Sequence, residues 1–76
     1  VSNFTVNITN SVTVNITSKG EGEVSAYAIA EDGTRTLLAS VSNGTASETV
    51  KLESGAYELV LYAVDGVGYS WNYNLG

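Results

Sequence analysis

The chain contains no cysteine, histidine, proline or methionine. Without cysteine there can be no disulfide. Without cysteine and histidine, the two ligand types that zinc and copper prefer are missing, so we expect neither of these metals. Calcium at the Asp32 or Asp65 turn is the weaker alternative, because neither turn is rich in oxygen ligands. We therefore expect no metal site and no cofactor. The same absences remove common catalytic bases and nucleophiles. The carboxylates Glu21, Glu23, Glu31 and Asp32 lie in or beside predicted turns, where we expect them to be solvated. The sequence does not predict an enzyme.

Basic residues and long apolar runs are also scarce. Only Lys19, Arg35 and Lys51 oppose eight acidic residues, which gives a formal net charge of -5. A nucleic-acid binder needs a basic patch to contact phosphates, so we expect no nucleic-acid partner. The longest purely apolar segment, residues 59–64, has six residues, whereas a helix needs about 20 to cross a bilayer. We therefore expect no membrane span.

A chain of 76 residues supports one small domain whose hydrophobic core alone is marginal for stability. Small domains usually add disulfides, a metal or a partner chain. Because the first two are excluded, we expect association with other chains. The sequence begins with Val rather than Met, and we expect a mature product from which a leader has been removed.

Serine, threonine and asparagine make up about a third of the chain, which together with abundant valine and tyrosine favours strands over helices. Turn signals recur at short intervals, and the Asp-Gly and Asn-Gly pairs favour tight hairpins. These signals are Lys19-Gly20-Glu21-Gly22, Asp32-Gly33, Asn43-Gly44, Ser54-Gly55 and Asp65-Gly66-Val67-Gly68. Strands are expected over residues 23–31, 34–42, 45–53, 56–64 and 69–75. This pattern predicts an all-β fold, a small immunoglobulin-like sandwich.

Residues 3–17 carry a longer alternation. Apolar side chains occupy even positions only, and the segment Thr5-Val6-Asn7-Ile8-Thr9 recurs eight residues later as Thr13-Val14-Asn15-Ile16-Thr17. One continuous strand over residues 3–17 would extend about 50 Å, too long for a domain of this size. A hairpin at Asn10-Ser11 is disfavoured by poor turn chemistry. A bend that passes the chain from one sheet to the other remains possible.

Residues 11–75 supply about six strands, one fewer than a seven-stranded sandwich. We therefore predict an N-terminal donor strand over residues 1–10, which protrudes from an immunoglobulin-like head over residues 11–76. Phe4, Val6 and Ile8 would anchor this strand in the groove of the next subunit, and head-to-tail pairing of this kind propagates into a filament. The alternative is that residues 3–9 form the first strand of their own closed sandwich.

Four N-glycosylation sequons occur among seven asparagines, at Asn3, Asn7, Asn15 and Asn43. Asn3, Asn7 and Asn15 are at odd positions, opposite the apolar face of their segment, and Asn43 lies in a turn. Glycans are bulky and must face water, which all four sites allow. The alternative is that Asn and Thr simply populate a solvated strand face.

Tyr69, Trp71 and Tyr73 alternate with polar residues in the last predicted strand. We expect these aromatic residues to pack in the core, or to line the acceptor groove beside an incoming donor strand. Stacking on a sugar, as in carbohydrate-binding modules, is the alternative.

This layout of a small sequon-rich chain with an alternating N-terminal strand resembles the subunits of archaeal thread filaments, which are built by donor-strand complementation and are N-glycosylated. The resemblance implies a structural subunit of an extracellular, cell-surface filament whose partners are identical subunits and covalent N-glycans. It assigns residues 1–9 to the donor strand and residues 11–76 to the acceptor head. Isopeptide links between subunits would have only Lys19 and Lys51 available. The alternative function is a glycosylated immunoglobulin-like or carbohydrate-binding module from a larger cell-surface protein.

Overall fold

The computed structural model describes residues 2–76, and Val1, the first residue of the predicted donor strand, lies outside them. The described chain consists of five antiparallel β-strands joined by short connections, so the all-β prediction is confirmed. Among residues 2–76, no helix is long and apolar enough to span a bilayer. The strands are β1 (Ser2–Ile8), β2 (Ser11–Ala30), β3 (Arg35–Lys51), β4 (Gly55–Ala63) and β5 (Tyr69–Leu75).

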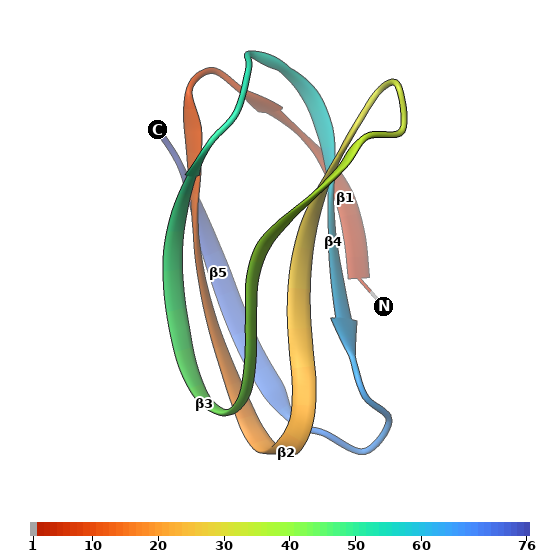
Figure 1. Cartoon of the computed structure of the whole chain (residues 1–76), viewed down its shortest axis with the longest axis vertical. Helices are drawn as coiled ribbons and strands as arrows, with labels where there is room; N and C mark the ends of the chain where they lie inside the picture. The colour runs from red at the N-terminus through yellow and green to blue at the C-terminus, as the bar shows by residue number, and fades with distance from the viewer. Residues whose placement is uncertain (1) are drawn as a thin grey trace.

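The two longest strands, β2 and β3, pair with each other and bend together near their middles (Figure 1). The register of β2 shifts between Ser18 and Glu23, at the predicted Gly-rich turn. The bend in β3 coincides with Asn43, which has a φ of 50°. Each strand therefore has two arms. Those of β2 comprise residues 11–18 and 23–30, and those of β3 comprise residues 35–42 and 44–51.

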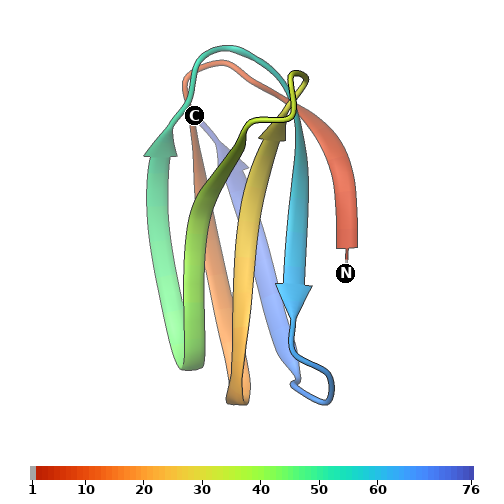
Figure 2. The same cartoon turned by 45° about the vertical axis from the view of Figure 1, so that its right-hand side comes forward.

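This bend folds one antiparallel sheet into two facing layers, which makes the domain sandwich-like (Figure 2). The first layer contains β1, β4, the second arm of β2 and the first arm of β3. The second layer contains β5, the first arm of β2 and the second arm of β3. The longest dimension of the molecule is 34 Å, which explains why the alternating N-terminal segment cannot remain one straight strand.

The core lies between the layers and follows the alternation in the sequence. In the first arm of β2, the even positions are buried and the odd positions face outwards. The second arm contributes small side chains, which allow the layers to approach each other closely. The core side chains are Ile8, Val12, Val14, Ile16, Val24, Ala26, Ala28, Leu38, Ala39, Leu59 and Leu61. Val60 is also buried, but on the outer face of the first layer.

Two predicted hairpin turns behave differently. At Asp32-Gly33 the strands on either side pair directly, and Gly33 has a φ of 90°, which glycine adopts without steric cost. At Asn43-Gly44 the expected tight hairpin does not form, because the two arms of β3 each pair with an arm of β2 and not with each other. Only Asn43 of this pair has a positive φ, whereas a type I′ turn requires it at both central residues.

The two terminal strands depart from the immunoglobulin arrangement. There, the first strand shares a sheet with the second, and the last strand shares one with the sixth. Here β1 pairs with β4, which is the sixth segment when the arms are counted separately, and β5 pairs with the first arm of β2. β1 therefore closes the sandwich of its own chain and does not protrude from it. The bend predicted as possible at Asn10-Ser11 carries the chain from the first layer to the second.

Candidate functional site: the N-terminal strand and its groove

β1 lies at the edge of the first layer and forms a ladder with β4 alone. The register is regular from Ser2 opposite Leu61 to Ile8 opposite Gly55. The alternation turns Phe4, Val6 and Ile8 towards the core. Ile8 is fully buried, whereas Phe4 and Val6 are half-buried and pack against the core cluster. The three predicted anchors therefore occupy a groove, and this groove belongs to their own chain.

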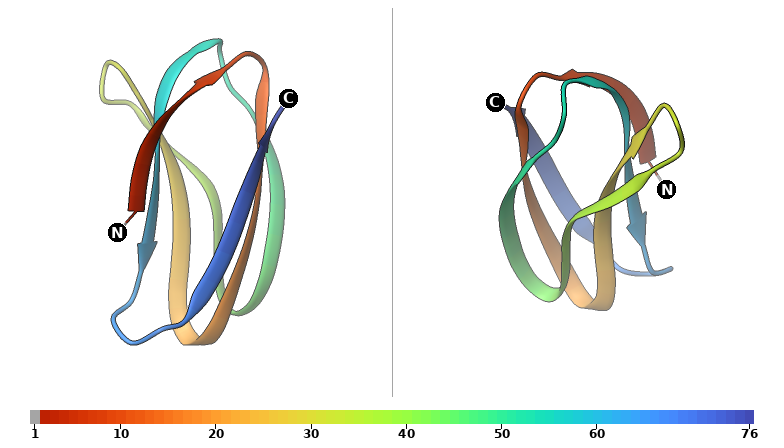
Figure 3. Two further views of the ribbon diagram at one scale, coloured as in Figure 1. Left: turned by 180° about the vertical axis from the view of Figure 1, so that it is seen from behind. Right: turned by 45° about the horizontal axis from the view of Figure 1, so that its top comes forward.

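Phe4 reaches the opposite layer and packs against the aromatic residues of β5. Its ring centroid is 5.8 Å from that of Trp71 and 5.2 Å from that of Tyr73. Trp71 and Tyr73 are themselves 5.9 Å apart. β1 and β5 lie on the same side of the molecule, as the view from behind shows (Figure 3, left). Phe4 thus covers the open side of the sandwich between two strands that do not pair with each other.

The aromatic row of β5 points inwards. Tyr69, Trp71 and Tyr73 lie opposite the buried residues Ser18, Ile16 and Val14 of β2 and pack against the core cluster. All three are partly exposed at the edge of the sandwich. Trp71 and Tyr73 form the surface on which Phe4 of β1 packs, and no aromatic residue of β5 lies on its outer face.

Only Thr9 and Asn10 connect β1 to β2, and both are exposed. The Asn10 carbonyl accepts a hydrogen bond of 3.0 Å from the backbone N–H of Leu52, just beyond the end of β3. The connection is therefore held at its second residue. Thr9 is the one residue between this fixed point and the buried end of β1.

Three of the four sequon asparagines are exposed, and the fourth, Asn15, is half-buried. Asn7 and Asn43 are exposed. Asn3 is also exposed, but its Nδ2 donates a hydrogen bond to Glu58. Asn15 is half-buried, and both of its polar atoms are engaged: Nδ2 donates to Asn72 at 2.9 Å, and Oδ1 accepts from Ser47 at 2.6 Å.

Asn15 is the centre of a regular polar array on the outer face of the second layer. Three rows cross the β3, β2 and β5 strands, and each row holds only hydroxyl and amide side chains. Each of the two outer rows contains a hydrogen bond between hydroxyl groups. The two oxygens are 2.8 Å apart in the Thr13–Thr49 pair and 3.2 Å apart in the Thr17–Thr45 pair. The remaining members are Ser70, Asn72 and Asn74. These three rows carry no charge, which is consistent with cross-strand hydrogen bonds holding their side chains in register. Lys51, opposite Ser11, lies beyond the rows on the same face.

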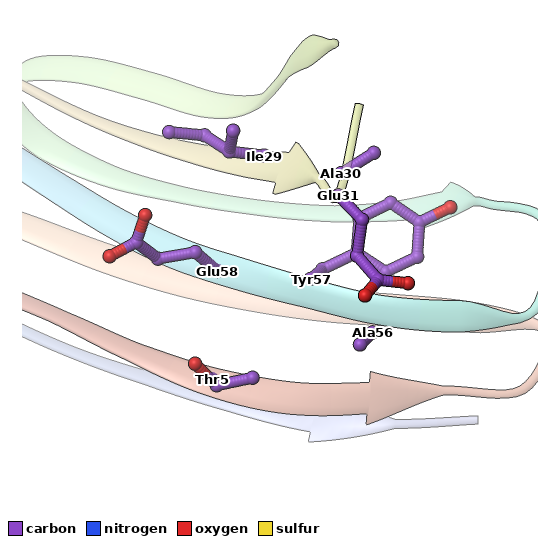
Figure 4. A pocket seen from close by; sticks show the side chains of 7 residues that line it. All are labelled: Thr5, Ile29, Ala30, Glu31, Ala56, Tyr57 and Glu58. Carbon is purple, nitrogen blue, oxygen red and sulfur yellow. The ribbon is translucent and has the colours of Figure 1, made fainter. Parts of the chain in front are cut away.

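A surface pocket of about 370 Å³ lies on the first layer beside β1 (Figure 4). Its lining includes the carboxylates of Glu31 and Glu58 together with the Tyr57 ring and Thr5. Within residues 2–76, no group of three or more His, Cys, Asp or Glu side chains is arranged to hold a metal ion. The pocket opens on the outer face, whereas the anchors of β1 point to the inner one.

The Asp32 carboxylate has a shifted pKa. The backbone N–H of Thr34 donates a hydrogen bond of 2.9 Å to Asp32 Oδ1, with the Thr34 side chain as a second donor, and these bonds lower the pKa of Asp32 below its ordinary value. Asp32 is fully exposed, and its role is to close the β2–β3 hairpin. It therefore acts in local turn structure.

The sequence reasoning missed one cluster on the outer face of the first layer. Tyr27 and Tyr62 form an edge-to-face pair with centroids 5.7 Å apart, and the Arg35 guanidinium lies 4.8 Å from the Tyr27 centroid. Tyr27 and Tyr62 come from different strands, so only pairing of β2 with β4 brings them together. The sequence offered one signal for this cluster, because the alternation placed the large aromatic Tyr27 on the outer face, opposite the small core residues of its strand.

No protein-family model, no curated protein and no solved structure matches this chain.

Proposed function

We propose that this chain is a structural subunit of an extracellular filament and that identical copies join head to tail by exchanging β1. The observation that carries the proposal is the position of β1. It supplies Ile8 to the core and Phe4 to the aromatic row, yet it forms a ladder with a single strand and is attached through two exposed residues.

Exchange would preserve every contact that β1 makes. In the single chain, β1 fills the groove between β4 and β5 of its own head. The same strand from a second copy would form the same ladder and bury the same three anchors. A fully buried side chain such as Ile8 contributes about 1.5–3 kcal/mol, and the half-buried Phe4 and Val6 contribute less. Domain swapping of this kind is a low-cost route to assembly, because it needs no new complementary surface.

The connection between β1 and β2 is short. The chain must pass from one layer to the other within Thr9 and Asn10, and facing sheets are about 10 Å apart. If Thr9 extends, β1 continues in the direction of β2 and leaves the molecule, so that it reaches the groove of a neighbour. Repeating this step without reciprocity makes an open chain of subunits.

N-glycans form the second part of the proposal. Asn7 and Asn43 are exposed and free for modification, and Asn3 lies on the outward face of β1. Sugars at these positions would shield the outer edges of β1 and the bend of β3, where unpaired strand edges otherwise invite uncontrolled association. Glycosylation of this density agrees with the proposed location on the cell surface.

A second candidate function is a closed glycosylated module within a larger cell-surface protein. The observation that favours it is the pairing of β1 with its own β4, which leaves a single copy complete. The carbohydrate-binding version of this candidate has less support, because Trp71 and its neighbours face inwards against Phe4.

Changing the length of the connection tests the two candidates. Deleting Thr9 and Asn10 keeps the even spacing of apolar residues but removes the bend that β1 needs to reach its own groove. Inserting four Gly and Ser residues there relaxes the bend. The filament proposal expects the deletion to increase polymers and the insertion to favour monomers, as measured by light scattering and electron microscopy.

A closed module gives the opposite pattern, in which the parent and the insertion variant are both monomers and the deletion yields no ordered assembly. Since the deletion variant can also fail to fold, a second measurement uses the head lacking residues 1–9 and a peptide of residues 1–9. Saturable binding of this peptide, followed by Trp71 fluorescence, supports the exchange. A folded head that ignores the peptide contradicts it.

A further inference from the structure

The outer face of the first layer carries a compact cluster that the core does not use. We name it the outer ledge, and it consists of Tyr27, Arg35, Leu37, Val60 and Tyr62. Tyr62 is 38% exposed and Leu37 is 51% exposed, whereas Val60 faces outwards and is only 5% exposed. The Arg35 guanidinium lies 4.8 Å and 5.8 Å from the two ring centroids, so the rings are held in place from one side. The ledge is an ordered, partly apolar surface.

The sequon residue Asn3 lies directly beside this ledge. Asn3 is the cross-strand partner of Val60, and Val60 in turn is the partner of Tyr27. Tyr62 lies two residues further along β4, on the same face, so it is the diagonal neighbour of Asn3. Such diagonal pairs are about 7–8 Å apart, which a long side group can span. Glu58, which accepts the hydrogen bond of Asn3 Nδ2, is the diagonal neighbour on the other side of Val60. A saccharide attached to Nδ2 must therefore extend back over Val60 to reach the Tyr62 ring.

The amide of Asn3 is held in a defined position. Its Nδ2 donates a hydrogen bond to the Glu58 carboxylate. N-glycosylation forms a bond between Nδ2 and the anomeric carbon of a glycosyl donor, whose pyrophosphate leaves while the amide loses one proton. The other amide proton remains, so Glu58 can still accept it. The linkage would then leave β1 from a fixed point on the outer face.

We propose that the saccharide carried by Asn3 packs against the outer ledge, with its apolar ring face on Tyr62. This inference rests on the proposed glycosylation. In an exchanged assembly, the same register places the saccharide of the donor strand on the ledge of the acceptor subunit. The sugar then adds an intersubunit contact beyond the ladder and the three anchors.

A saccharide fits the ledge better than a second copy of the chain does. A standard protein interface takes about 20–30 residues from each partner. The ledge has five residues, and Val60 among them is already covered. The sequon at its border supplies a covalent occupant of suitable size, and ring faces of tyrosine accept apolar CH groups of a partner.

The test compares glycosylated full chains that differ in one sequon. Thr5→Ala removes the Asn3 sequon and leaves the Asn3–Glu58 contact intact, whereas Thr5→Ser retains the sequon as a matched control. Thr9→Ala removes the Asn7 sequon, whose asparagine lies opposite Ala56 and away from the ledge. Each change is made in the parent and in Tyr62→Ala, and thermal unfolding is measured after mass spectrometry has established occupancy.

We expect loss of the Asn3 sugar to lower Tm by about 4 °C in the parent and by much less in Tyr62→Ala. Loss of the Asn7 sugar should change Tm equally in both backgrounds. An equal drop in both backgrounds on loss of the Asn3 sugar overturns the inference. An Asn3 that carries no sugar also overturns the inference. If Asn7 and Asn43 carry sugars in that case, the proposed glycosylated subunit still stands.

Discussion

Phe4 and Trp71 pack with their ring centroids 5.8 Å apart although they come from opposite ends of the chain. Phe4 belongs to the first layer and Trp71 to the second, and no backbone ladder joins their strands. The contact therefore exists only while β1 occupies the groove. Because Trp71 is the sole tryptophan, its fluorescence reports on that occupancy.

The Phe4–Trp71 contact predicts a spectroscopic response. Phe4→Ala should shift the emission of Trp71 to longer wavelength, because water reaches the indole once the neighbouring ring is removed. It should also lower the free energy of unfolding by about 1–3 kcal/mol, since Phe4 is only half-buried. Thr5→Ala in unglycosylated protein is the control, because its side chain faces outwards, and it should leave the emission unchanged. Unaltered emission in Phe4→Ala contradicts the packing of β1.

Ile8 is the most buried of the three anchors of β1, at 2% exposed. Ile8→Ala should lower the free energy of unfolding by about 2–5 kcal/mol, because it removes apolar burial and leaves a cavity. Val6→Ala, at a half-buried position, should cost less. Urea denaturation measures both values. A cost below about 0.5 kcal/mol for Ile8→Ala would show that β1 is not docked in solution.

Gly22 and Gly20 lie in the same bend of β2 but in different surroundings. A Cβ on Gly22 would overlap the Val67 side chain, with Val64 Cβ also only 3.2 Å away, whereas nothing lies within 4 Å of a Cβ on Gly20. Gly22→Ala should therefore destabilise the protein by about 1–3 kcal/mol through overpacking. Gly20→Ala should be neutral or slightly stabilising, because alanine restricts the unfolded chain. Equal thermal unfolding of the two variants would refute this assignment.

Asp32 provides a prediction about pH. Its carboxylate accepts hydrogen bonds from Thr34, which lower its pKa in the folded state. The resulting stabilisation is present above the unfolded pKa of about 3.9 and is lost as the pH falls through the lower folded value. Asp32→Asn should remove this part of the pH dependence. NMR titration of the Asp32 carboxyl carbon checks the direction, and a midpoint at or above the ordinary value would contradict it.

The sequons should differ in occupancy. We expect Asn7 and Asn43 to be modified more completely than Asn15, because the Asn15 amide donates to Asn72 and accepts from Ser47 between two flanking strands. Glycopeptide mass spectrometry measures the occupancy of each site. Replacing Asn72 and Ser47 by alanine should raise modification at Asn15 if the hydrogen bonds limit it. Full occupancy of Asn15 in the parent chain would show that modification precedes folding of this sheet.

The sequence predicted some parts of the chain correctly and others wrongly. The alternation over residues 4–16 correctly placed Val12, Val14 and Ile16 in the core, because side chains in a strand alternate between two faces whatever the partner strand is. The Asp32-Gly33 hairpin was also predicted correctly, because turn chemistry depends on adjacent residues. The bend of β3 at Asn43 was misjudged as a tight hairpin, because the partner of each arm is a distant segment and not the other arm.

The sequence by itself determined that the chain forms strands, where most of them turn, and which side chains avoid water, because these properties depend on composition and on spacing of two residues. Only the tertiary structure decided which strands are neighbours. In the folded protein Phe4 contacts Trp71, Asn3 lies beside the outer ledge, and β1 pairs with β4 of the same chain. These are pairings between segments far apart in sequence, and an unpaired strand edge accepts any strand of matching register, so alternation alone does not specify the partner.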